Sequence, residues 1–192
     1  VLHASESVGI KIPTLCYIKD LLPDGSCRMC MVEIESRGRT KMETACTAQV
    51  AEGLVVTTNS EKVRNARRNI LDMLLSNHKT DCFSCPSNGD CKLQELCFEY
   101  GIERTTYSGE QTELPIDDSN KFFTYNPNLC ILCHRCVNTC HKVVGRGAID
   151  TMERGFDSAI GTPFHIDWAD TNCESCGNCV QACPTGALTM KR

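Results

Sequence analysis

Sixteen cysteines are the residues of this 192-residue sequence that are best suited to chemistry. They fall into four blocks, which span residues 16–46, 82–97, 130–140 and 173–183. Disulfides, zinc sites and iron–sulfur clusters are the structures that use thiols at such a density. The spacing within each block has to distinguish among these three kinds of site.

The last two blocks carry the same motif, C-x-x-C-x-x-C-x-x-x-C, and the second copy is followed by Pro184. Because every internal spacing is repeated, the two blocks indicate a duplication. In two-cluster ferredoxins three closely spaced cysteines bind one [4Fe-4S] cluster and the fourth binds the other cluster. We therefore expect two clusters with crossed ligand sets, which are Cys130, Cys133, Cys136 and Cys183 for one and Cys140, Cys173, Cys176 and Cys179 for the other.

Zinc and disulfides explain this motif less well. A tetrahedral zinc site usually pairs two C-x-x-C knuckles and does not need a third cysteine at the same spacing. The sequence has no apolar run long enough to span a bilayer and no secretory signal, so we expect a cytoplasmic protein. Structural disulfides are rare in that reducing compartment.

The first block contains Cys16, Cys27, Cys30 and Cys46, which form a plausible [2Fe-2S] ligand set. Its spacing departs from the plant-type C-x4-C-x2-C pattern. The turn residues 23–26 precede the C-x-x-C pair and would let backbone amides approach the sulfur atoms. On spacing alone, a zinc site or buried free thiols remain alternatives.

The second block combines a histidine with three cysteines, which are His78, Cys82, Cys85 and Cys91. We expect these residues to bind a third [4Fe-4S] cluster. An imidazole in place of a thiolate removes a negative ligand and raises the potential of a cluster. Cys97 is then left over, and we interpret it as a buried thiol. The alternative is that Cys97 replaces His78 as the fourth ligand.

Helices and strands are expected around these blocks. Ser60 is a good N-cap for a helix over residues 61–75, with its apolar residues on one face and its arginines outside. A second helix is predicted from about residue 91 to 100, and Gly101 would end it. Residues 31–35 and 53–58 are predicted to form strands. The polar stretch 105–120 is typical of a linker or covering loop.

The formal net charge of −4 at pH 7 offers no basic surface for nucleic acid. We therefore expect neither nucleic-acid binding nor a membrane span.

The order of the motifs resembles the N-terminal region of iron-only hydrogenases and of molybdenum- or tungsten-dependent, NAD(P)-linked formate dehydrogenases. It is also similar to the large iron–sulfur subunit of respiratory complex I and to the diaphorase small subunit of NAD-reducing nickel–iron hydrogenases. The resemblance covers essentially the whole chain. The segments that carry it include Cys27–Cys30, Asn88–Gln94, Arg154–Phe156 and Cys183–Leu188.

The resemblance implies an α+β architecture of three domains. Residues 1–59 would form an incomplete β-grasp [2Fe-2S] ferredoxin domain that lacks its first hairpin, and residues 60–104 a small helical domain with the histidine-ligated cluster. After the linker 105–120, residues 121–192 would form a two-cluster domain similar to bacterial ferredoxins.

The resemblance also implies the function of an electron relay with one [2Fe-2S] and three [4Fe-4S] clusters and no catalytic residue of its own. A catalytic domain or subunit with a molybdenum or tungsten pterin or an H-cluster would follow, together with NAD(P)- or ferredoxin-linked electron-transfer subunits. The two complete cysteine repeats favour the formate dehydrogenase or iron-only hydrogenase branch over complex I. The alternative is a separate relay subunit of an NAD(P)-linked hydrogenase, a diaphorase or a complex-I-like assembly.

Overall fold

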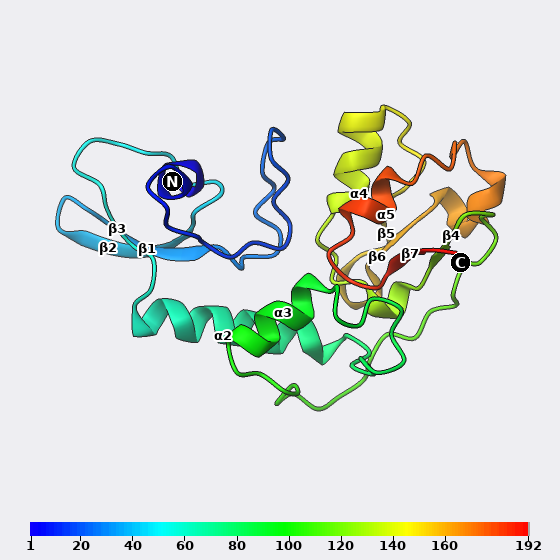
Figure 1. Ribbon diagram of the computed structural model, residues 1–192, viewed down its shortest axis with the longest axis horizontal. Coiled ribbons are helices and arrows are strands. Elements are labelled where there is room, and N and C mark those ends of the chain that lie inside the picture. Colours follow the sequence, from blue (N-terminus) through cyan, green and yellow to red (C-terminus); the bar gives the residue numbers. More distant parts are fainter. Residues whose placement is uncertain (192) are drawn as a thin grey trace.

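A three-stranded antiparallel sheet forms one end of the molecule (Figure 1) in the computed structural model, which describes residues 1–191. The central strand β1 (Met31–Ser36) pairs with β2 (Arg39–Thr44) on one side and with β3 (Val55–Thr57) on the other. Strands β1 and β3 confirm the two predicted strands, and β3 is shorter than expected. Strand β2 is absent from the prediction because its sequence is polar and its outer residues are exposed.

The short helix α1 (Leu2–Ser7) is anchored to the chain that follows this sheet (Figure 1). The Leu2 backbone N–H donates to the Ala45 carbonyl at 2.9 Å. Leu2 also belongs to a buried cluster with Val32 and Ile34, the alternate residues of β1 that point to one face. This core contains Cys30, so the first part of the chain packs its apolar residues around a cysteine.

Helix α2 (Glu61–Ser76) begins and ends close to the predicted limits. The Ser60 side-chain oxygen accepts a hydrogen bond from the Val63 backbone N–H at 3.1 Å, which is the expected N-cap. The prediction that all its arginines lie outside is wrong, because Arg67 is only 3% exposed. Arg67 stands on the buried stripe, midway between Val63 and Leu71, and the helical repeat turns this stripe towards β1.

Helix α3 (Lys92–Glu99) lies beside α2 (Figure 1) and confirms the second predicted helix. Gly101 follows it with a φ of +64°, a left-handed conformation that glycine adopts without strain. The Ile102 backbone N–H donates back to the Cys97 carbonyl at 2.8 Å, which closes the helix as a Schellman motif. The predicted end at Gly101 is therefore confirmed.

Residues 105–120 run as an extended segment that returns along α2. Thr105 and Thr106 donate hydrogen bonds to the Asp72 carboxylate, and the Thr112 backbone N–H donates to the Asn77 side chain at 2.7 Å. The segment has one isolated bridge and otherwise no helix or strand. Hydrogen bonds to side chains in and directly after α2 therefore hold this segment in place.

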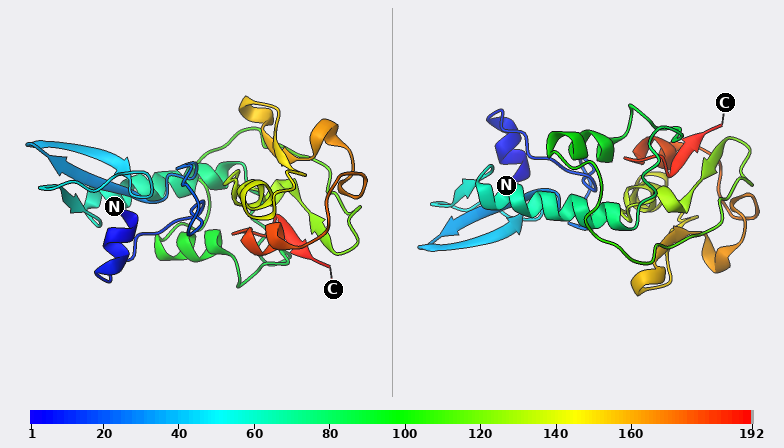
Figure 2. Two further views of the ribbon diagram at one scale, coloured as in Figure 1. Left: turned by 90° about the horizontal axis from the view of Figure 1, so that it is seen from above. Right: turned by 90° about the horizontal axis from the view of Figure 1, so that it is seen from below.

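The other end of the molecule contains short helices and two small sheets, as the two views in Figure 2 show. The pairs of antiparallel strands are β4 (Phe123–Tyr125) with β7 (Leu188–Met190), and β5 (Asp150–Met152) with β6 (Ala159–Gly161). The helices are α4 (Arg135–Asn138), which continues as the π-helix η2 (Thr139–Val144), and α5 (Asn178–Ala182). Short 3-10 turns are η1 (Pro127–Leu129), η3 (Gly155–Asp157), η4 (Pro163–His165) and η5 (Trp168–Asp170).

Three aromatic residues fill the core of this part. Trp168 packs edge-on against Phe123, with ring centroids 4.9 Å apart, and it stacks on Tyr125 at 5.3 Å. Cysteine side chains of both copies of the repeat pack around this core. Within residues 1–191, none of the helices combines the length and the apolar character needed to cross a membrane.

Leu71 lies fully buried where α2 meets the other parts of the chain, so we predict that Leu71→Ala destabilises the protein by about 2–5 kcal/mol. The measurement is an anaerobic urea titration followed by circular dichroism. Met73→Ala is the matched control, because Met73 is 53% exposed on the same helix and its truncation should cost less than about 0.5 kcal/mol. Equal shifts for the two variants would contradict this assignment of the core.

Candidate metal centres

The four cysteines of the first block converge in pairs. Cys27 donates a side-chain hydrogen bond to Cys16, and Cys30 donates one to Cys46. These hydrogen bonds lower the pKa values of Cys16 and Cys46 and raise those of Cys27 and Cys30. The two thiols of each pair therefore lie close together, and the donor set fits a cluster held by four thiolates.

Backbone amides approach the sulfur atoms in the same way in three loops. The Met29 N–H lies 3.4 Å from Cys27 Sγ, the Leu132 N–H lies 3.4 Å from Cys130 Sγ, and the same holds two residues after Cys173. Hydrogen bonds from neutral amides stabilise the negative charge on a thiolate. These loops are therefore built to receive thiolates that carry metal.

The duplication extends to the backbone conformation. Leu132 and Ser175, which occupy the same position in the two copies, have φ values of 51° and 56°. His134 and Gly177, also equivalent, have φ values of 60° and 76°. Left-handed residues at matched positions are uncommon outside glycine, so the two loops share one conformation that the ligand geometry requires.

The fourth cysteine of each repeat lies near cysteines of the other repeat, which is the proximity that crossed ligand sets would require. The charge of Cys183 acts on all three leading thiols of the first copy, which are Cys130, Cys133 and Cys136. The charge of Cys140 acts on Cys179 together with Cys173 and Cys176. The fourth cysteine of each copy therefore lies with the first three of the other.

Burial keeps these thiols from ionising by themselves. It raises the pKa of Cys130 to about 11 and the pKa values of Cys133 and Cys179 to about 12. Buried free thiols would stay protonated at neutral pH, whereas bound iron replaces the proton. Iron would therefore have to displace a proton from each of these thiols when it binds.

His78 lies just after the end of α2 and is 7% exposed. Burial lowers its pKa to about 4, so the imidazole is neutral at physiological pH, which is the form that binds metal. Its Nδ1 atom is the one buried side-chain nitrogen or oxygen within residues 1–191 that has no hydrogen-bond partner. Such an atom costs about 1–3 kcal/mol when left unsatisfied, and an iron atom bound by His78 would remove that penalty.

The cysteines of the second block lie near one another, since the charges of Cys85 and Cys82 both act on Cys91. Cys97 is buried in α3, as expected, and burial raises its pKa to about 11. The charges of Cys91 and Cys82 also reach Cys97. Cys97 is thus a near neighbour of this site.

Within residues 1–191, no three histidine, cysteine or acidic side chains are arranged around a single metal ion. A cluster distributes its ligands over several iron atoms, so its cysteines do not need to converge on one point.

The loops that carry the cysteines also contact one another. The Ser26 hydroxyl, next to Cys27, donates to the Cys133 carbonyl at 3.3 Å. The Lys92 backbone N–H, next to Cys91, donates to the Pro184 carbonyl at 2.9 Å. The first two blocks therefore both touch the loops of the site that contains Cys133 and Cys183.

Gly186 allows one of these contacts to be close. A Cβ atom at this position would lie 2.7 Å from Cys85 Sγ and 3.3 Å from the Leu129 side chain. Only glycine leaves room for the Cys85 sulfur here.

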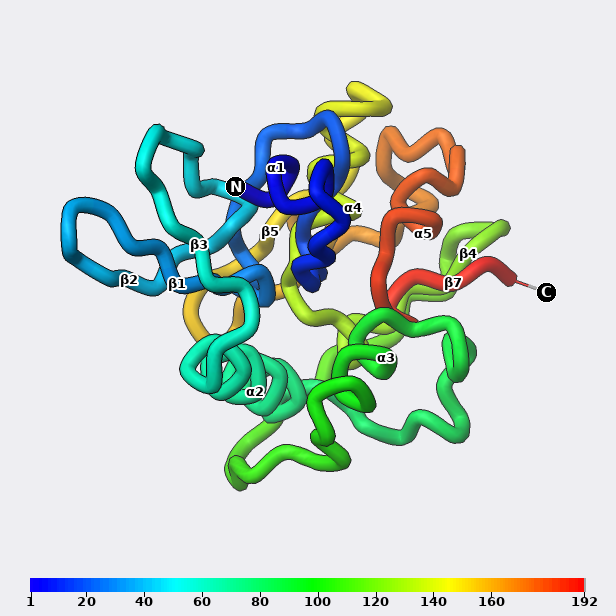
Figure 3. Tube along the Cα trace, turned by 60° about the vertical axis from the view of Figure 1, so that its left-hand side comes forward, coloured from blue at the N-terminus to red at the C-terminus, as the bar shows by residue number. Residues whose placement is uncertain are grey.

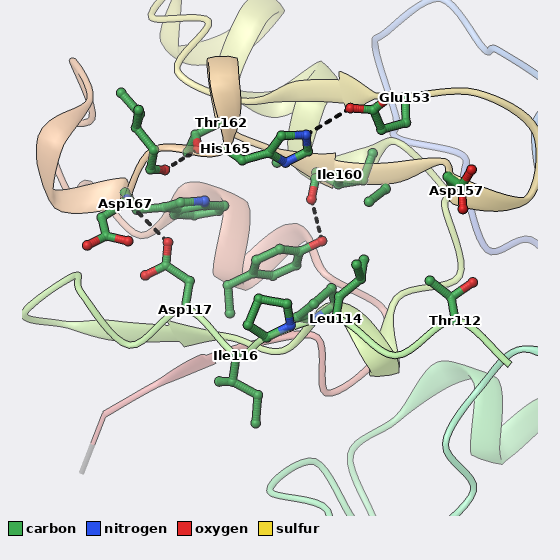
Figure 4. A pocket seen from close by; sticks show the side chains of 17 residues that line it. Thr112, Leu114, Ile116, Asp117, Glu153, Asp157, Ile160, Thr162, His165 and Asp167 are labelled. Atoms are coloured by element: carbon green, nitrogen blue, oxygen red, sulfur yellow. Dashed lines mark hydrogen bonds and ion pairs between the residues drawn. The ribbon is translucent and has the colours of Figure 1, made fainter.

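A cleft of about 500 Å³ lies elsewhere, between the extended segment and β6 (Figure 4). His165 and Glu153 form an ion pair of 2.9 Å beside it, and the Tyr125 hydroxyl donates to the Ile160 carbonyl at 2.5 Å. No cysteine lines this cleft, so it is separate from the candidate metal centres.

Three family models match successive parts of the chain. A 2Fe-2S iron-sulfur cluster binding domain matches residues 1–61, and the NADH-ubiquinone oxidoreductase-G iron-sulfur binding region matches residues 67–106. The ferredoxin-like domain of NADH-quinone oxidoreductase subunit 3 matches residues 121–189. The chain thus contains iron–sulfur binding regions of the [2Fe-2S] and [4Fe-4S] types.

Curated relatives are similar over nearly the whole chain. The alpha subunit of NADPH-Fe(3+) oxidoreductase from Geobacter sulfurreducens is 42% identical over 191 residues, which cover 100% of this chain and 22% of the relative. NADP-reducing hydrogenase subunit HndD from Solidesulfovibrio fructosivorans is 39% identical over 193 residues, which cover 98% and 33%. The mitochondrial 78 kDa subunit of NADH-ubiquinone oxidoreductase from Candida albicans is 36% identical over 193 residues, which cover 100% and 26%. The chain therefore spans between 22% and 33% of these relatives.

A solved structure is similar to the entire chain. In the crystal structure of an NAD+-reducing [NiFe]-hydrogenase in the H2-reduced state, one chain matches with a TM-score of 0.90 and 32% identity. The match covers 100% of this chain and 80% of that chain.

We predict that His78→Cys keeps the cluster of the second block and lowers its reduction potential, because a thiolate adds negative charge where a neutral imidazole stood. Redox titration followed by electron paramagnetic resonance (EPR) measures this potential. Cys97→Ser is the control and should leave the spectrum and potential unchanged. Loss of the cluster from Cys97→Ser, with His78→Cys indistinguishable from wild type, would assign the fourth ligand to Cys97.

Proposed function

We propose that this chain relays single electrons through four clusters within a larger oxidoreductase. The proposal starts from the family to which the chain belongs, which is that of the NADH-quinone oxidoreductase iron–sulfur regions that NAD-reducing hydrogenases share. The chain is a ferredoxin-like, mixed α/β electron-transfer module. The observation that carries the proposal is that Cys183 lies near Cys133 of the other repeat and Cys140 lies near Cys179.

Four ligand sets make up the proposed relay. One [2Fe-2S] cluster would be held by Cys16, Cys27, Cys30 and Cys46, and three [4Fe-4S] clusters would be held by His78, Cys82, Cys85 and Cys91, by Cys130, Cys133, Cys136 and Cys183, and by Cys140, Cys173, Cys176 and Cys179. When bound, the clusters supply reversible one-electron oxidation and reduction of iron. The close pairs of thiols in the first block and the unsatisfied nitrogen of His78 support these sets.

The chain's own residues would fix the position and the potential of each site. The amides that follow Cys27, Cys130 and Cys173 donate to sulfur and favour the more negative, reduced state. The neutral imidazole of His78 removes one negative ligand from its site. These effects would give the four sites different potentials although most ligands are the same.

Contacts between the ligand loops support an order of the sites. The site that contains Cys133 touches the first block through Ser26 and the second block through Pro184 and Gly186. The charge of Cys179 also acts on Cys136 of the same site. This site would therefore neighbour the other three and connect them.

We also propose that the three domains have the limits expected from the sequence, at residues 1–59, 60–104 and 121–192, with a linker at 105–120. The first domain would be an incomplete β-grasp, the second a small helical domain, and the third a two-cluster ferredoxin domain. The N-cap of α2 at Ser60 and the lack of regular structure between the second and third domains support these limits.

The larger assembly would join this relay to NAD(P)- or ferredoxin-linked subunits and to a catalytic centre with a molybdenum or tungsten pterin or an H-cluster. The two complete repeats favour a formate dehydrogenase or an iron-only hydrogenase. A specific observation favours a second candidate, a separate relay subunit of an NAD(P)-linked hydrogenase, since the match to the hydrogenase chain covers 80% of that chain. We also propose a cytoplasmic location, because a reducing compartment keeps the ligand cysteines out of disulfides.

Metal analysis of the chain purified without oxygen tests the proposal. We expect about 14 iron atoms per chain, reversible bleaching of the visible absorption on reduction, and no turnover by the chain alone. Cys183→Ser should remove one [4Fe-4S] cluster, or about 4 iron atoms, while Cys97→Ser should remove none. A zinc content close to the iron content, or a chain that transfers all its iron to apo-ferredoxin, would contradict the relay.

A further inference from the structure

Arg67 is a buried cation in the middle of α2, where the neighbouring residues of the stripe, Val63 and Leu71, are apolar. Its Nε and Nη2 atoms donate to the Met31 carbonyl at 3.2 and 2.7 Å, and its Nη1 atom donates to the Tyr100 hydroxyl at 3.0 Å. These acceptors are neutral. Among residues 1–191, Arg67 forms no ion pair with a carboxylate.

A guanidinium group stays charged at any pH that a protein meets. Burying such a charge without a counter-charge is costly even when its hydrogen bonds are made. An apolar side chain would continue the stripe without that cost. We therefore expect the buried charge of Arg67 to be balanced by an anionic group that is not a carboxylate.

The proposed [2Fe-2S] site is a group close to Arg67 that can supply this charge. Met31, whose carbonyl accepts two hydrogen bonds from Arg67, follows Cys30 directly in the chain. Leu71, one helical turn further along α2, packs in one buried cluster with Cys16 and Cys27. A cluster with four thiolate ligands is an anion, and reduction adds one further negative charge.

We propose that Arg67 is a positioning residue that raises the reduction potential of the [2Fe-2S] site through its buried positive charge. The inference rests on the proposed function, because it assigns this site to the first block. A fixed cation in a poorly solvated interior stabilises the reduced cluster more than the oxidised cluster. Strand β1 and helices α2 and α3 lie close to one another (Figure 3). The hydrogen bonds of Arg67 join β1 to α2 and to the end of α3, so they fix this charge relative to the proposed cluster.

Redox titration of the whole chain, followed by the EPR signal of the [2Fe-2S] cluster, separates charge from packing. In Arg67→Gln, the amide can still donate to the Met31 carbonyl but the charge is gone. We expect the ratio of reduced to oxidised cluster at a fixed potential to fall at least about tenfold, which is a shift of about 59 mV for one electron. Arg67→Lys, which keeps the charge, should change this ratio by less than about threefold.

Two further variants are matched controls. Arg64→Gln removes the same charge from the exposed face of α2, where solvent and salt screen it, and should change the ratio by less than about threefold. Tyr100→Phe removes one hydrogen bond of Arg67 and keeps the charge, so the potential should stay close to that of wild type. A potential of Arg67→Gln within the range of these two controls would overturn the proposal.

Cluster content decides the case in which Arg67→Gln does not assemble. If Arg67→Lys then keeps the [2Fe-2S] signal near the wild-type potential, the role of the charge is supported. If Arg67→Lys also loses the cluster, Arg67 is purely structural and the proposal fails. A wild-type chain without any [2Fe-2S] signal would instead refute the proposed function, whatever the variants do.

Discussion

The structure depends on one constraint: its cysteine side chains are buried, but they can bind iron only as charged thiolates. Burial raises the pKa values of Cys130, Cys133 and Cys179 far above neutral pH, so water and neighbouring side chains cannot ionise them. Bound iron removes this conflict, because it replaces the proton of each thiol and neutralises the charge that is left behind. A cluster bound at these thiols would be both the cofactor and the centre of a core.

The three groups of buried core side chains reflect this constraint, since each group contains cysteines. Apolar residues such as Leu15, Met29 and Leu93 surround the sulfur atoms and do not form a separate core. The regular elements are short, and many loop residues have positive φ values. Such loops gain little from hydrogen bonding within themselves, so the metal has to supply much of what orders them.

The parts of the chain are joined through the same loops. Arg135, two residues after Cys133, donates to the carbonyl of Ala182, before Cys183, and to the carbonyl of Tyr17, after Cys16. Residues that bind or flank a cluster thus also hold neighbouring sites together. The close approach of Gly186 to the sulfur of Cys85 is another contact of this kind.

Features with a strong local pattern could be predicted from the sequence. The cap at Ser60 and the end of α3 at Gly101 follow from spacing and backbone preference, and the spacing of the repeats also predicts that Cys183 lies near Cys133. Features that depend on tertiary contacts could not. Strand β2 is polar because it lies at the edge of its sheet, and the charge of Arg67 predicts an exposed side chain although its position on the apolar stripe buries it.

The sequence does not predict the helices and strands that the structure has within residues 145–170. Strands β5 and β6 have three residues each, which is too short for a pattern of alternating polarity to be detected. The left-handed residues at 132 and 175 are leucine and serine, and neither type indicates a positive φ. Their conformation is set by the amides that must face the preceding cysteine sulfurs.

Removal of iron tests most directly whether the clusters organise the fold. The chain, kept without oxygen, is treated with a strong iron chelator while circular dichroism and the visible absorption of the clusters are recorded together. We predict that both signals are lost in parallel and that the iron-free chain has no cooperative thermal transition. An iron-free chain that keeps its helical signal and melts cooperatively would contradict this account.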